Sequence, residues 1–80
     1  MQHWQNNLSM KINQVYKYEE QNLTLIFLYL KNLKGENYDH QVFVLFSSED
    51  KENQPFKFST GQYLKFGTGS NLYRLSEEVK

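Results

Sequence analysis

The sequence LTLIFLYL at residues 23–30 and the sequence VFVLF at residues 42–46 decide the fold. Each run is apolar at both its odd and its even positions, whereas a strand with one solvent-exposed face alternates apolar and polar residues. Both faces of these segments therefore need cover, and a chain of 80 residues offers little material to supply it. The pattern predicts either a closed or layered β core, or a surface that another molecule covers.

The segment 22–34 also admits a helix. Its leucine-rich sequence places Ile26, Leu30 and Leu33 at helical spacing, and Gly35 follows where a glycine commonly caps a helix C-terminus. Against a helix, the segment is apolar nearly all round and strand-like segments flank it closely. Short apolar runs are ambiguous by periodicity alone, so we expect a strand here and keep the helix as the alternative.

Shorter strand-like segments precede and follow the two long runs. They span residues 11–18, 56–58, 63–66 and 72–75, separated by polar or glycine-containing turns. The sum predicts an all-β fold, a small antiparallel meander of five to six strands that forms a barrel or a compact sandwich. The expected core consists of Ile12, Tyr16, Leu25, Phe27, Val42, Val44, Phe46, Phe56, Phe58, Leu64 and Phe66.

The chain has room for one small domain. We expect a polar lead-in at residues 1–9, a single β domain at 10–76, and a charged tail at 77–80, with one helical turn begun by Ser76 as an alternative for the tail. The longest apolar run is well short of the roughly 20 residues that a spanning helix needs. The N-terminus also lacks the regions of a secretion signal, so we expect a cytoplasmic protein.

Composition excludes several classes of function. The chain has no cysteine, which rules out disulfides, thiolate zinc sites and thiol nucleophiles. Six tyrosines, six phenylalanines and one tryptophan must therefore supply much of the core, and they favour sheet over helix. The nine basic and nine acidic side chains balance, which argues against bulk electrostatic binding to DNA and against an acidic DNA mimic.

No catalytic or metal-binding motif is present in the sequence. Asp39 and His40 are the only adjacent acid and imidazole, but neighbours in an extended segment point to opposite sides, so we expect an ordinary loop histidine. His3 is the only other imidazole, and no pair has ligand spacing within one element. The glycine-containing residues 67–70 lack the spacing of a phosphate-binding loop. We therefore expect a non-enzyme without metal or cofactor.

The doubly apolar strand gives the first candidate binding surface. If the sheet is open, one face of residues 23–30 becomes an exposed apolar patch, with Ile26 and Leu28 at its centre, and such patches mark protein interfaces. The predicted function is a small non-catalytic protein-binding module: a subunit, adaptor or inhibitor of a larger partner, or a homodimer. An inhibitor of phage or mobile-element origin fits the same class.

The C-terminal third gives the second candidate surface. Residues 53–75 hold three basic side chains and no acidic one, interleaved with aromatic residues. If the strands alternate regularly, one sheet face collects Lys57, Tyr63, Lys65, Tyr73 and Arg74. Cations beside aromatic rings on a sheet can bind single-stranded nucleic acid, which is the alternative function. Binding of that kind weakens steeply with salt, whereas an apolar protein interface does not.

Overall fold

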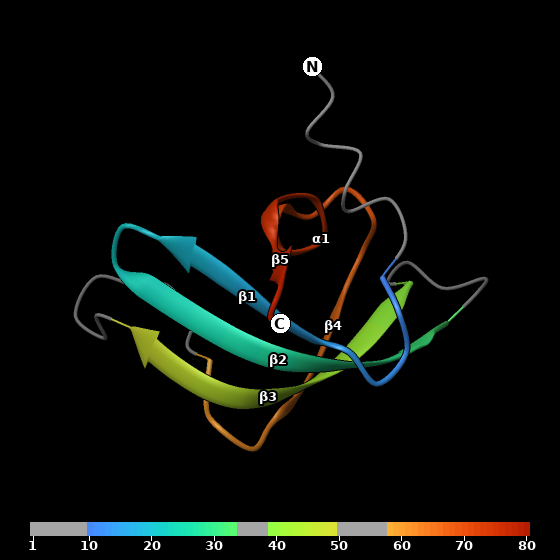
Figure 1. The fold of residues 1–80 in the computed structure, drawn as a ribbon, viewed down its shortest axis with the longest axis horizontal. Helices are drawn as coiled ribbons and strands as arrows, with labels where there is room; N and C mark the ends of the chain where they lie inside the picture. Colours follow the sequence, from blue (N-terminus) through green and yellow to red (C-terminus); the bar gives the residue numbers. More distant parts are fainter. Residues whose placement is uncertain (1–9, 34–38, 50–57) are drawn as a thin grey trace.

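The computed structural model describes residues 10–33, 39–49 and 58–80. Five of its elements are strands that form a single antiparallel sheet in the order β4-β3-β2-β1-β5 (Figure 1). The elements are β1 (Val15–Glu20), β2 (Leu23–Asn32), β3 (His40–Glu49), β4 (Tyr63–Phe66), α1 (Asn71–Leu75) and β5 (Glu77–Glu78). Strands β1 to β4 are sequential neighbours, which confirms the predicted antiparallel meander.

The sheet is not closed into a barrel. Strands β4 and β5 lie at its two edges, and the strands curve around the side on which α1 lies (Figure 1). Among the described residues, the second layer is therefore this short helix and its flanking turns, not a second sheet. The mostly β, compact character of the prediction is confirmed, whereas the closed form is not.

Strand β2 occupies the centre of the sheet, and the helix alternative for this segment is wrong. Its odd-numbered residues from Leu23 to Tyr29 are buried and the even-numbered ones are half-buried. Both edges of the strand are hydrogen-bonded, to β1 and to β3. Side chains of the neighbouring strands β1 and β3 partly cover β2 on both faces of the sheet. This cover explains why β2 is apolar at both its odd and its even positions.

The core lies on the face of the sheet toward α1. Phe27 is fully buried at its centre, stacked on Tyr16 with ring centroids 6.0 Å apart and in edge contact with Phe66 at 5.8 Å. Aromatic pairs of this geometry add about 0.5–1.5 kcal/mol beyond the apolar area they bury. The buried apolar set is Tyr16, Tyr18, Leu23, Leu25, Phe27, Tyr29, Val42, Val44, Phe66 and Tyr73.

Two residues predicted for the core are exposed. Ile12 lies in the turn before β1 and is 63% exposed. Phe46 is 47% exposed because a bulge shifts the β2–β3 register, so that Phe46 is paired with Ile26 on the other face of the sheet. Phe58 and Leu64 are half-buried against the core, and Phe56 lies outside the described residues.

Residues 72–75 form helix rather than the predicted strand. The hydroxyl of Ser70 caps the N-terminus of α1 by accepting a hydrogen bond from the Leu72 amide at 3.1 Å. The four residues Leu-Tyr-Arg-Leu at 72–75 are too few to distinguish a strand from a single helical turn by pattern, and the cap together with the burial of Tyr73 selects the helix. The alternative of a helical turn begun by Ser76 is also wrong, because Glu77–Glu78 form β5.

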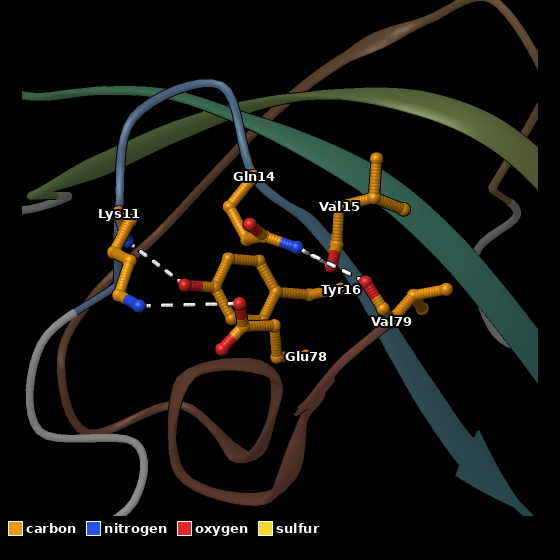
Figure 2. Close-up of polar contacts among 6 residues, drawn as sticks. All are labelled: Lys11, Gln14, Val15, Tyr16, Glu78 and Val79. Carbon is orange, nitrogen blue, oxygen red and sulfur yellow. Dashed lines mark hydrogen bonds and ion pairs between the residues drawn. The ribbon is translucent and has the colours of Figure 1, made fainter.

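The C-terminal residues are fastened to the outer edge of β1 (Figure 2). The Val79 amide donates to the Val15 carbonyl at 2.9 Å, and the Gln14 side chain donates to the Val79 carbonyl at 3.1 Å. The Lys11 amide donates to the Tyr16 hydroxyl at 2.8 Å. The first two bonds join the start of β1 to Val79, so the N-terminal strand and the C-terminal residues are held side by side.

Candidate binding face

The face of the sheet that points away from α1 is here called the open face. None of the described helices and strands lies across it. Its members follow from the strand registers, because residues directly opposite one another in an antiparallel pair point to the same side. They are Val15, Lys17 and Glu19 on β1, Thr24, Ile26, Leu28 and Lys31 on β2, Gln41, Phe43, Phe46 and Ser48 on β3, Tyr63 and Lys65 on β4, and Glu77 on β5.

An apolar row crosses the middle of the open face over four strands. Leu28 is paired with Val15 on one side and with Phe43 on the other, and Phe43 is paired in turn with Tyr63. The rings of Phe43 and Tyr63 meet edge to face, with centroids 5.0 Å apart. Tyr63 is nevertheless 64% exposed, so the row ends in an accessible aromatic ring.

A second row lies beside the first. It consists of Lys17, Ile26 and Phe46, which are paired across β1, β2 and β3. The bulge that exposes Phe46 also leaves Leu45 exposed next to it. Ile26 and Leu28 therefore lie together on the open face, as the sequence predicted for an open sheet. Both are half-buried by their neighbours rather than fully exposed.

A polar row borders the apolar centre on the other side. Gln41 is paired with Lys31 on β2 and with Lys65 on β4. A second register shift, between Tyr29 and Lys31, turns Lys31 to the open face after a run in which odd-numbered residues point to the core. No ion pair joins either of these lysines to another described residue, whereas Lys17 lies 3.8 Å from Glu19.

The predicted aromatic–basic set does not share one face. Tyr63 and Lys65 both lie on the open face, but Tyr73 is buried on α1 and stacks on the His40 ring at 4.4 Å. Arg74 is exposed on the same helix, where it donates to the Asn71 side chain at 3.0 Å. The helix at 71–75 is the reason, because it removes these residues from the strand alternation on which the prediction relied. Lys57 lies outside the described residues.

The sequence interpretation missed a series of hydrogen bonds that runs from the buried His40 ring to the exposed Thr68 and on to the half-buried Asp39. The Tyr29 hydroxyl lies 2.8 Å from His40 Nδ1, and His40 Nε2 lies 3.1 Å from Thr68 Oγ1. The Thr68 hydroxyl donates to Asp39 Oδ2 at 3.1 Å. Because Thr68 uses its proton on the carboxylate, it accepts from a protonated Nε2, which leaves Nδ1 to accept from Tyr29. Both ring nitrogens of a neutral His40 imidazole therefore have a hydrogen-bond partner.

His40 is a core residue rather than the expected loop histidine. It begins β3 and lies on the same face as Val42 and Val44, two and four residues on. Burial lowers the pKa of the imidazole, and the nearby Asp39 carboxylate opposes that effect only in part. Continuing the alternation of the apolar run 42–46 backward by two residues would have indicated this position. The arrangement joins β2, β3 and the turn before α1, and it serves stability.

The described residues contain no group of three or more His, Cys, Asp or Glu side chains that could hold a metal ion. None of their helices is long and apolar enough to span a membrane. Comparison with known proteins found no matching family model, no matching curated protein and no matching solved structure.

Proposed function

We propose that the chain is a small non-catalytic protein-binding module whose open face contacts a partner protein. The observation that carries the proposal is the apolar row of Leu28, Phe43 and Tyr63, with Phe46 exposed beside it. Protein interfaces commonly have an apolar, aromatic-rich centre and a polar rim, and the open face has this composition. The subunit, adaptor, inhibitor and homodimer roles, and the cytoplasmic location, belong to the same proposal.

Aromatic side chains of this kind can dominate binding. Truncation of a central interface tyrosine or tryptophan commonly costs at least about 2 kcal/mol of binding free energy. Tyr63 has the right placement for such a role, since it is exposed and its ring is held in position by the edge contact with Phe43. The half-buried Leu28, two strands away in the same row, extends the apolar surface.

Single-stranded nucleic-acid binding is the weaker candidate. The burial of Tyr73 and the location of Arg74 on α1 remove two of the five residues on which that hypothesis depended. Tyr63 and Lys65 remain, and a single aromatic–cation pair gives little stacking and little phosphate contact.

The test is a selection of binding peptides from a displayed random library against the full chain. Peptides that use the open face should lose at least about tenfold in affinity for Leu28→Asp and for Tyr63→Ser, since each change removes apolar contact area. Tyr63→Ser is the more secure variant for folding because the side chain is exposed. Ile12→Ser is the matched control, because Ile12 has nearly the same exposure, 63%, outside the open face. Peptides that bind both open-face variants as well as the parent would contradict the proposal.

A further inference from the structure

We infer that the open face takes a segment of another protein that combines apolar and acidic side chains. This inference rests on the proposed function and adds the chemistry of the partner. Its basis is the placement of charge on the open face. Lys31 and Lys65 lie in the polar row with no acidic residue opposite them, whereas the two glutamates of this face, Glu19 and Glu77, lie on β1 and β5 beside Lys17.

The spacing of charge and apolar surface is set by the sheet. Lys31 and Lys65 flank Gln41 on neighbouring strands, so their Cα atoms are separated by two strand spacings, about 10 Å. Rows that share a face are about 7 Å apart along the strands. The polar row therefore lies two residues along the strands from Phe43 and Tyr63. A partner that places apolar side chains on the centre can reach the lysines with acidic side chains a few residues away.

The lysines are available for such contacts. Neither Lys31 nor Lys65 forms an ion pair with another described residue, and both side chains are exposed. Lys17 is already near Glu19, so its charge is partly neutralised. Charge pairs at the rim of an interface contribute mainly to association rate and to choice of partner, which is the role that this arrangement suits.

The same charges bear on the two other occupants. A second copy whose polar row met the polar row of the first would set Lys31 and Lys65 of the two copies against one another, and like charges oppose such packing. A single-stranded nucleic acid would meet the lysines well, but the middle of the face offers half-buried Leu28 and Phe43 rather than a series of exposed rings for base stacking.

The experiment extends the peptide selection. Peptides recovered against the full chain are sequenced, and their affinities are measured by fluorescence anisotropy at two salt concentrations. We expect recovered peptides to be enriched in Asp and Glu together with Leu, Phe, Tyr or Trp. The double variant Lys31→Gln with Lys65→Gln should bind them roughly threefold to tenfold more weakly, and the loss should shrink as salt rises. The control is Lys80→Gln, which also replaces an exposed lysine by glutamine but lies outside the open face. It should leave the affinity unchanged.

The outcomes separate this inference from the proposed function. Peptides that depend on Leu28 and Tyr63 but lack acidic residues and ignore the lysine changes would overturn the inference and leave the proposed function standing. Peptides that depend on none of these residues would overturn both. A fluorescent oligothymidine that binds with a steep salt dependence, lost in the lysine variant, would replace the protein partner with a nucleic acid. A dimer in light scattering that Tyr63→Ser dissociates would replace it with a second copy.

Discussion

His40 is held as a neutral imidazole in the interior, between the hydroxyls of Tyr29 and Thr68. Protonation would require a charge in a buried site and would turn Nδ1 into a donor facing a hydroxyl that already donates to it. The Asp39 carboxylate lies one hydrogen bond further on and compensates only in part. Stability should therefore depend on pH through this residue.

The sign of that dependence follows from the lowered pKa of His40. At pH values just below the ordinary histidine value of about 6.5, the unfolded chain binds a proton that the folded chain does not. The free energy of unfolding should be at its full value above that pH and should fall as the pH drops below it. Urea unfolding across pH 5 to 8 measures the trend. His40→Asn should be less stable at neutral pH with a flatter profile, while a drop of the same steepness in that variant would contradict the role of His40.

Neighbouring residues in β2 should differ sharply in their contribution to stability. Phe27 is fully buried, so Phe27→Ala should lower the free energy of unfolding by about 3–5 kcal/mol. Leu28 is half-buried on the open face, so Leu28→Ala should cost about 1 kcal/mol. Chemical denaturation of the two variants checks this contrast. Equal losses would show that the open face is covered and that Leu28 belongs to the core.

At the scale of elements, α1 depends on its cap more than on its intrinsic helical tendency. Its five residues are too few to form a stable helix in isolation. The Ser70 hydroxyl and the packing of Tyr73 on His40 hold it against the sheet.

Ser70→Ala should therefore lower the free energy of unfolding by about 1 kcal/mol, because it leaves the Leu72 amide without its cap. Ser59→Ala, in the exposed turn before β4, serves as the control and should have little effect. Urea unfolding followed by circular dichroism measures both. An unchanged stability in Ser70→Ala would show that the cap contributes nothing to holding α1.

The long strands could be predicted from the sequence because their apolar runs have no other stable placement in so short a chain. Strand β4 was predicted with its observed bounds, since Tyr63 to Phe66 alternate and follow a Thr60–Gly61 turn in which Gly61 has a positive φ of 87°. The face of the sheet on which Phe46 and Lys31 lie could not be predicted. Each follows a bulge, and one additional residue in a strand reverses the alternation beyond it without a clear signal in composition.

The candidate site was predictable to the same extent. Ile26 and Leu28 came from the doubly apolar pattern of β2, and the structure places them on the open face. Tyr73 and Arg74 were assigned to the aromatic–basic face because strand alternation was extended into residues 72–75. These residues are helical, so the wrong secondary structure led to the wrong site residues. The series of hydrogen bonds at His40 depends on Thr68, which is 28 residues distant in sequence, and no local pattern connects the two.

At the scale of the whole molecule, the sheet is covered on one face only by the described elements. The chain is neutral overall, and on the open face Lys31 and Lys65 lie apart from the two glutamates, which are on β1 and β5. The sheet buries its largest apolar residues around Phe27 and has a second apolar surface, half-buried or exposed, on the open face.

The most direct measurement is a methyl and amide NMR titration of the isotope-labelled chain with a peptide recovered from the library selection. The account predicts shift changes confined to the open face, at the methyl groups of Val15, Ile26 and Leu28 and at the amides of Phe43 and Tyr63. Shift changes that cluster on α1, around Tyr73 and Arg74, with the open face unaffected, would contradict it.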